Sequence, residues 1–252
     1  MKPQIELART ETPDGGKMVL YRHDDELSIQ INGQALMSSK RHESELALAR
    51  LGCAHLVGHA DPHVLIGGLG MGYTLRQTLD MLGENATMTV SELLPDVVEW
   101  NREHFTALNG QPLNDARTKI ELGDIFNLLE VSDKRFDAIL LDIDNGPSAK
   151  TDEGNGQLYT RAGMEMCKRA LRKGGTLAVW SAEPSKPFEH LLIRCGFHVR
   201  RYKVPAYAGT TKNSHFIWVA AESPKVLPPG GGEPRPEKKK KPKGKRYAYK
   251  KR

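Results

Sequence analysis

The sequence lacks the patterns that mark membrane-spanning, secreted and zinc-binding proteins. It has no run of about 18 apolar residues, the minimum for a transmembrane helix. Its first residues, MKPQIELARTETPDGG, contain no apolar stretch of the secretory type. Only 3 cysteines occur, Cys53, Cys167 and Cys195, and none has CxxC spacing. We therefore expect a cytoplasmic protein without membrane contact, with no metal and with reduced cysteines that serve as packing residues.

Excess positive charge is missing from most of the chain. Residues 222–252 hold 12 lysines and arginines against 3 acids, whereas the other 221 residues hold 25 against 28. The Pro/Gly-rich stretch 222–236 and the low-complexity stretch 237–252 cannot bury a core, so we expect both to be disordered. The basic residues suit RNA or another polyanion. A solubilising tail without a specific partner is the alternative.

From residue 64 onward the chain alternates between strand and helix patterns. This alternation predicts an α/β fold with a doubly wound, mostly parallel, seven-stranded sheet. The last two strands are joined by the short loop PAYAGTTKN, which favours a C-terminal antiparallel hairpin. The expected strands are 64–67, 87–92, 118–122, 136–142, 175–181, 196–204 and 214–221, and the expected helices are 72–82, 95–107, 124–130, 157–172 and 186–194.

The N-terminal part predicts a small extension to that domain. Residues 18–22 and 27–31 read as extended runs, and Asn32-Gly33 is a turn signal, so a β-hairpin or meander is expected. Residues 40–56 have the apolar spacing of a helix. We therefore divide the chain into an extension (1–60), a nucleoside-binding domain (61–221) and a linker with a basic tail (222–252).

A glycine-rich loop follows the first strand of the predicted domain. Four of its six positions are glycine: Gly67, Gly68, Gly70 and Gly72. Such a turn lets the backbone approach a ligand and exposes the amides of the next helix. Glu92, 20 residues after Gly72, is placed to accept from both hydroxyls of a ribose. Its alternative role is that of a favourable charge at a helix N-terminus.

Acidic residues also follow the third and fourth strands. Asp124 is placed to accept from the exocyclic amine of adenine, or else to cap the next helix. Asp142 and Asp144 flank one residue and so point the same way. Two adjacent carboxylates are costly without a cationic or donor partner. Because ligands bind at the carboxyl ends of parallel strands, these glycines and acids predict one converging site.

These segments resemble the spermidine/spermine synthase superfamily, a branch of the class I S-adenosylmethionine-dependent methyltransferase fold. The resemblance covers roughly residues 17–220, through VLIGGLGMGYTLR, SELLPDVVEWNR, LGDIF and FDAILLDIDNGP. It implies that a set of residues binds the nucleoside: Gly68, Gly70, Gly72, Glu92, Asp124 and Asp142. It also implies Asp142, with Asp144 beside it, as the catalytic or amine-orienting acid, and decarboxylated S-adenosylmethionine as the cofactor.

The chain departs from that family around the amine. Met71 stands where the family's loop usually has an acid that meets the aminopropyl ammonium. The segment MSSKRHESELALA lacks the family's Tyr-His pair. Family geometry would place His42, Glu43 and Glu45 near the substrate, but their pattern favours a solvated helix face. Trp180 is either pocket lining or core, and His215, beside the last loop, has no defined chemistry.

Three functions stay open. Methyl transfer from S-adenosylmethionine to an amine or similar nucleophile is the main expectation, because an acid at Met71 would repel a cofactor that keeps its carboxylate. Aminopropyl transfer from decarboxylated S-adenosylmethionine is the alternative, with Asp142 helping to deprotonate the attacking amine. The third is a non-catalytic nucleoside-binding adaptor tethered to RNA by the tail. A homodimer and the identity of the acceptor also stay open.

Overall fold

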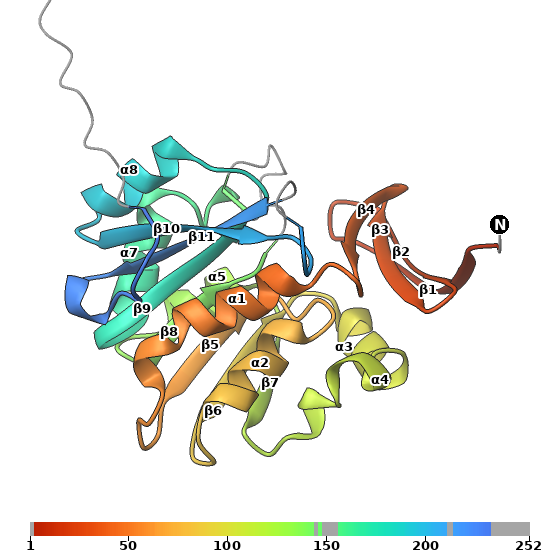
Figure 1. The fold of residues 1–252 in the computed structure, drawn as a ribbon, viewed down its shortest axis with the longest axis horizontal. Helices are drawn as coiled ribbons and strands as arrows, with labels where there is room; N and C mark the ends of the chain where they lie inside the picture. The colour runs from red at the N-terminus through yellow and green to blue at the C-terminus, as the bar shows by residue number, and fades with distance from the viewer. Residues whose placement is uncertain (1–2, 144–145, 148–155, 211–213, 233–252) are drawn as a thin grey trace, which may run out of the picture.

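Two β-sheets make up the framework of the chain. The computed structural model describes residues 3–143, 146–147, 156–210 and 214–232. Within them, a four-stranded antiparallel sheet is followed by a seven-stranded, mostly parallel sheet that carries helices on both faces (Figure 1). The predicted α/β class, with its seven-stranded sheet and small N-terminal extension, is confirmed.

The N-terminal sheet is a meander in the order β1-β2-β3-β4. Its strands are β1 (Ile5–Glu11), β2 (Lys17–His23), β3 (Glu26–Ile31) and β4 (Gln34–Ser38). The two predicted runs correspond to β2 and β3, whereas β1 and β4 were not expected, because most of their side chains are exposed or only partly buried and show no clean alternation. The Thr10 hydroxyl donates to Asp96 Oδ2 at 2.8 Å, which ties β1 to the main domain.

The main sheet has the strand order β10-β11-β9-β8-β5-β6-β7. Its strands are β5 (His63–Gly67), β6 (Thr87–Glu92), β7 (Thr118–Leu122), β8 (Phe136–Leu141), β9 (Leu171–Ser181), β10 (His198–Pro205) and β11 (Ser214–Ala221). β11 pairs antiparallel with both β9 and β10, as the short loop predicts. β9 begins at Leu171, earlier than expected, because Leu171 already pairs with Phe136 of β8.

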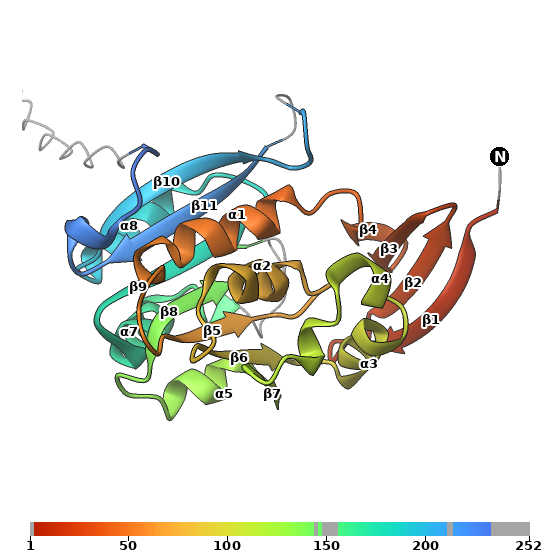
Figure 2. The same cartoon turned by 60° about the horizontal axis from the view of Figure 1, so that its bottom comes forward.

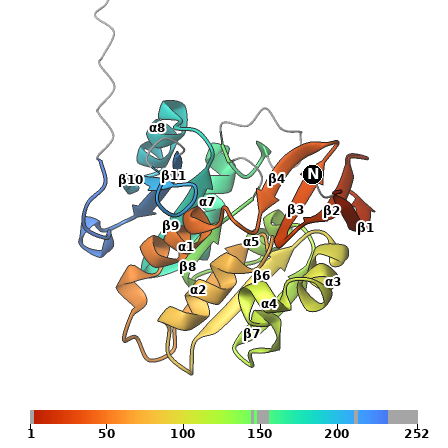
Figure 3. The same ribbon diagram turned by 45° about the vertical axis from the view of Figure 1, so that its right-hand side comes forward.

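Helices cover both faces of this sheet (Figure 2). The helices are α1 (Glu43–Gly52), α2 (Tyr73–Met81), α3 (Pro95–Glu103), α4 (Thr106–Asn109), α5 (Ile125–Glu130), α7 (Arg161–Ala170) and α8 (Lys186–Arg194). One apolar core lies beneath α1, α2 and α3, and a second beneath α5, α7 and α8. α1 lies beside α2 and crosses β8, β9 and β11, so it packs as part of the main domain (Figure 3).

Residues 222–232 correct one expectation. They were predicted to be disordered, but they pack back onto β10: Leu227 is buried, and the Tyr202 hydroxyl and Arg200 donate to the carbonyl of Pro228. A Pro/Gly-rich segment can be fixed in this way when neighbouring side chains satisfy its carbonyls. The basic stretch 237–252 lies outside the described residues.

Other expectations from composition can be compared with the described part of the chain. The three cysteines are free and buried, as expected of packing residues. None of the helices in the described ranges is long and apolar enough to span a membrane. In the same ranges, no three histidine, cysteine or acidic side chains are grouped as a metal site would need.

Candidate active site

The carboxyl ends of four neighbouring strands meet at one edge of the main sheet. Gly67 at the end of β5 is in register with Ser91 of β6 and Leu141 of β8. Backbone hydrogen bonds join the loops beyond these strand ends: Gly68 N–H donates to Ser91, Asp142 N–H to Gly67, and Gly123 N–H to Glu92, each at 2.9 Å. The glycine loop, Glu92, Asp124 and Asp142 are therefore brought together, as the sequence predicts.

The glycine loop has no room for side chains. Gly68 has φ +86°, and a Cβ there would lie 2.4 Å from the carbonyl oxygen of Asp142. Gly72, at φ +81°, would meet the Asn109 amide at 2.7 Å. Asn109 also donates to the carbonyl of Met71 at 2.9 Å, and Asn101 donates to the carbonyl of Gly70 at 2.8 Å. The loop backbone is thus enclosed by the Asp142 backbone and by the two asparagine side chains.

Glu92 is buried and held by the backbone. One carboxylate oxygen accepts from Leu69 N–H at 2.8 Å and the other from Leu94 N–H at 2.9 Å. A carboxylate oxygen can accept more than one hydrogen bond, so backbone contacts of this kind are compatible with a ligand hydroxyl as a further donor. Asp124 caps α5 by accepting from Phe126 N–H at 2.8 Å, so the capping role is the one seen. We call Gly67–Gly72, Glu92 and Asp124 together the nucleoside side.

Asp142, directly after β8, lies near a second carboxylate, that of Glu45 in α1, and its charge acts on that residue. The Thr74 hydroxyl, in the first turn of α2, donates to Asp142 Oδ2 at 2.8 Å. Burial raises the pKa of Asp142 to about 6, against the effect of that hydrogen bond. Burial and the nearby charge of Asp142 raise the pKa of Glu45 to about 8. We call Glu45, Thr74 and Asp142 the amine side.

The two raised pKa values define the charge of the amine side. Both pKa values are shifted upward, mainly by burial, so the pair keeps a proton to a higher pH than two exposed carboxylates would. Within the described ranges, neither carboxylate forms an ion pair with a lysine or arginine. A cation placed between them would gain attraction from both, and a proton carried by that cation has an acceptor at hand.

Glu45 was predicted near the substrate only from family geometry, because its sequence pattern favoured a solvated helix face. The expected solvated face holds for Glu43, which approaches Arg50 at 4.0 Å, but it is wrong for Glu45. Glu45 shares the spacing i, i+3, i+4 with Leu48 and Ala49, which are both buried against the sheet. That spacing was the available signal. Thr74 offered none, because a threonine in the first turn of a helix is ordinary.

A row of contacts leads from Glu45 through Ser44 of α1 to side chains of β11 and β9. Ser44 Oγ donates to Glu45 Oε2 at 2.7 Å, and His215 Nδ1 lies 2.9 Å from Ser44 Oγ. The His215 ring packs edge-on against Trp180 at 4.8 Å between centroids. Burial lowers the pKa of His215, and the positive charge of Arg41 lowers it further. Trp180 therefore borders the site as well as packing on the core.

Two further predicted positions have different outcomes. Met71 is 3% exposed and belongs to the apolar core beneath α1, α2 and α3, so the loop supplies no acid there. Met37 of β4 packs on the same loop, where a Cβ at Gly70 would come within 3.1 Å of its methyl group. Asp144, the predicted partner of Asp142, lies outside the described residues.

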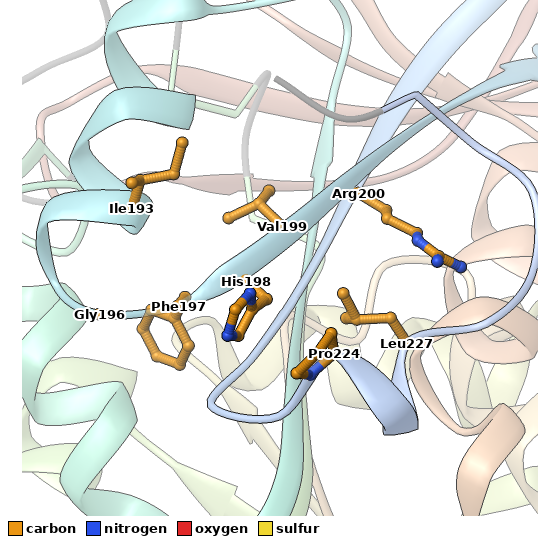
Figure 4. Close-up of a pocket in the computed structure, with 8 residues that line it drawn as sticks. All are labelled: Ile193, Gly196, Phe197, His198, Val199, Arg200, Pro224 and Leu227. Atoms are coloured by element: carbon orange, nitrogen blue, oxygen red, sulfur yellow. The ribbon is translucent and has the colours of Figure 1, made fainter. Parts of the chain in front are cut away.

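A hollow of about 450 Å³ lies elsewhere (Figure 4). It is lined by residues from the end of α8, the start of β10 and the turn at Pro224–Val226, among them Phe197, His198 and Arg200. His198 is the first residue of β10, and β10 runs in the same direction as β9 because both strands pair antiparallel with β11. The hollow therefore lies at the amino ends of these strands, whereas the glycine loop lies at the carboxyl ends.

The doubly wound sheet, the glycine loop and the acids at successive strand ends define a class I transferase-type fold. Residues 52–206 match the spermine/spermidine synthase domain, and the chain belongs to that family. The predicted resemblance is confirmed.

Individual relatives agree with this assignment. Polyamine aminopropyltransferase 2 of Pseudomonas aeruginosa is 32% identical over 133 residues, which are 51% of this chain and 36% of that protein. The polyamine aminopropyltransferase of Escherichia coli O1:K1 is 35% identical over 165 residues, which are 60% of this chain and 53% of that protein. The chain thus spans about a third to a half of the length of these relatives.

The fold has close counterparts among solved structures. A spermidine synthase crystallised with the transition-state analogue AdoDATO superposes with a TM-score of 0.69 at 17% identity, over 89% of this chain and 76% of that one. The spermidine synthase of Thermotoga maritima gives the same TM-score and identity. At this identity the likeness establishes the fold.

Proposed function

We propose that this protein transfers an aminopropyl group from decarboxylated S-adenosylmethionine to the nitrogen of a small amine. The observation that carries the proposal is the amine side: Asp142, held by the Thr74 hydroxyl, and Glu45 lie beside the glycine loop. Burial raises the pKa of both carboxyls, and we infer that the pair holds one proton between them. Such a pair attracts an ammonium ion and can take its proton, and positioning next to the donor then supplies most of the acceleration. The names of the relatives support aminopropyl rather than methyl transfer, which reverses the order expected from the sequence.

The nucleoside side fits the donor. Glu92 is held beside the glycine loop by Leu69 N–H and Leu94 N–H, where its carboxylate would accept from the ribose hydroxyls, and the loop glycines allow close approach of the backbone. Leu93, directly after Glu92, is 44% exposed and offers an apolar surface to the purine ring. Asp124 lies at the next strand end, where its carboxylate would accept from the adenine amine. The donor's sulfonium supplies the reactive carbon; the chain supplies the orientation.

The amine side replaces the acid that Met71 does not provide. An ammonium that enters a partly buried site needs carboxylates to replace its lost hydration. Glu45 and Asp142 supply two, and Thr74 fixes the orientation of one of them. An adaptor tethered to RNA and a homodimer gain no support from the relatives, and they form no part of the proposal.

The nucleoside product distinguishes the two transfers. The protein is incubated with decarboxylated S-adenosylmethionine or S-adenosylmethionine and a panel of amines: 1,3-diaminopropane, putrescine, cadaverine and spermidine. Aminopropyl transfer yields 5′-methylthioadenosine and a lengthened amine, whereas methyl transfer yields S-adenosylhomocysteine; chromatography with mass spectrometry separates them. We expect 5′-methylthioadenosine that depends on the amine. S-adenosylhomocysteine in its place, or no nucleoside product from either donor, would overturn the proposal.

A further inference from the structure

The proposed reaction leaves one proton in the site at each turnover. The amine arrives as an ammonium ion and gives a proton to the Glu45–Asp142 pair. Its lone pair then forms the new C–N bond as the C–S bond breaks, and the electron pair of that bond goes to sulfur. The product nitrogen keeps two hydrogens and a positive charge, so the proton on the carboxylates must leave before the next turnover.

A row of side chains leads away from Glu45. Ser44 Oγ lies 2.7 Å from Glu45 Oε2 and 2.9 Å from His215 Nδ1, so one hydroxyl bridges the carboxylate and the imidazole. Ser44 is fully buried, whereas His215 at the start of β11 is partly exposed. The order therefore runs from the reacting pair, through a buried hydroxyl, to a titratable ring on a partly exposed residue.

We propose that Ser44 and His215 form a proton relay that removes the proton from the Glu45 carboxyl after each transfer. The inference rests on the proposed function, because it assigns an exit to a proton which that reaction produces. Ser44 and His215 touch neither reactant and act through Glu45, so they are positioning residues of the amine side.

The hydrogen-bond chain can run in two directions. When Glu45 is ionised, the Ser44 hydroxyl donates to Oε2 and its oxygen accepts from Nδ1–H of His215. When Glu45 is protonated, Oε2–H donates to Ser44, whose hydroxyl then donates to an Nδ1 that carries no proton. Moving the proton from Glu45 to His215 needs only a shift along these two bonds.

The surroundings of His215 favour release of the proton. Trp180 of β9 and Ser44 of α1 are neutral neighbours, and Glu45 is reached through Ser44. Burial and the charge of Arg41, which lies over the Tyr207 ring, both lower the pKa of His215. An imidazolium formed there therefore loses its proton readily at neutral pH.

The relay can be tested without turnover. The ¹⁵N shifts of the His215 ring report which nitrogen carries the proton, and they are followed from pH 6 to 9 in the full-length protein. We expect the tautomer to switch from Nε2–H to Nδ1–H as Glu45 ionises near pH 8. The switch should be absent in Glu45→Gln and in Ser44→Ala. A tautomer that stays the same across this range, or that switches equally in both variants, would overturn the relay.

Steady-state kinetics give a second test once an amine that the protein converts to product is known. His215→Gln and Ser44→Ala should each lower kcat roughly tenfold with little change in KM, as loss of assisted proton transfer does. Because the two act in series, the double variant should be no slower than the slower single variant. Added imidazole should restore part of the rate of His215→Gln. His198→Gln, on the neighbouring strand at the opposite sheet edge, is the matched control.

The outcomes separate the two proposals. Unchanged kcat in both single variants, or losses that add in the double variant without rescue by imidazole, would show packing roles only and would overturn the relay. Neither result affects the product assay, which decides the proposed function by itself. If the wild-type protein forms no product, the ¹⁵N titration still decides whether Glu45 and His215 exchange a proton through Ser44.

Discussion

Glu92 and Asp142 are carboxylates that follow β6 and β8, the two strands on either side of β5, yet they are held in different ways. Glu92 accepts a backbone N–H on each oxygen, so its position is fixed by the fold itself. Asp142 accepts from one threonine hydroxyl and faces a second carboxylate. The nucleoside side is therefore complete before any ligand arrives, whereas the amine side holds electrostatic repulsion that a bound cation would relieve.

From this difference we propose that the nucleoside side binds the donor and that the amine side carries the chemistry. A preformed set of backbone contacts changes little during a reaction and so contributes mainly to affinity. A carboxylate pair with raised pKa values can change its protonation when an amine binds or reacts. Substitutions on the two sides should consequently affect different kinetic constants.

The largest effect is expected from Asp142→Asn. Turnover should fall by about 10²–10⁴-fold, because the amide cannot accept the amine's proton. Donor affinity should stay within about threefold, a change of under 1 kcal/mol. Rapid-mixing assays and calorimetry measure the two quantities. Asp137→Asn is the control. Asp137 lies at the amino end of β8, away from the site, where it pairs with Arg172, so this variant should leave turnover unchanged. Parallel losses of affinity and turnover would erase the distinction between the two sides.

Gly68→Ala tests the nucleoside side at its tightest point. The new Cβ would lie 2.4 Å from the Asp142 carbonyl, and the φ of +86° is strained for alanine. Strain of about 1–3 kcal/mol should weaken donor binding by roughly 10–100-fold. Calorimetric titration with the donor measures this. Gly83→Ala has open space around it and should bind normally. Normal donor binding by Gly68→Ala would mean that the loop does not contact the nucleoside.

Glu92→Gln should give a smaller loss on the same side. The amide lacks the charge that strengthens hydrogen bonds from hydroxyls, and one of its two acceptors becomes a donor facing a backbone N–H. We expect donor affinity to fall roughly tenfold, about 1.4 kcal/mol, with a smaller change in kcat. The control is Glu121→Gln, on the exposed surface of β7. A loss confined to kcat would contradict the binding role of Glu92 and would indicate that it takes part in the chemical step.

Glu45→Gln should change stability in a pH-dependent way. Because the pKa of Glu45 is raised from 4.5 to about 8, the folded protein keeps a proton there that the unfolded chain has lost. Wild-type stability from this group therefore falls as pH rises from 4.5 to 8, and glutamine removes that fall. The variant should gain on the order of 1–2 kcal/mol at pH 8 relative to pH 5.

Thermal unfolding across this pH range measures the effect as a few degrees in Tm. Glu43→Gln, in the same helix turn and paired with Arg50, should show no such trend. A stability difference between Glu45→Gln and wild type that stays constant with pH, or that is widest at pH 5, would contradict the raised pKa.

The nucleoside side and Asp142 could be predicted from the sequence to lie together, whereas the positions of Glu45 and Thr74 beside them could not. Gly67–Gly72, Glu92 and Asp124 follow strands whose patterns are strong, and parallel strands bring their ends together by necessity. The amine side depends on where α1 crosses the sheet, because this crossing brings Glu45 and Ser44 to Asp142 and His215. Crossing positions come from tertiary packing, and no local pattern encodes them. The strands β1 and β4 were missed for a related reason: too few of their side chains are buried to alternate.

The proton balance of amine binding tests the shared proton most directly. Calorimetry at pH 7 in two buffers of different ionisation enthalpy counts the protons released when a diamine binds in the presence of 5′-methylthioadenosine. The account predicts release of between about 0.5 and 1 proton per amine by the wild type, because the cation drives Glu45 to ionise, and a much smaller release by Glu45→Gln. Equal release by the two proteins, or none by the wild type, would contradict it.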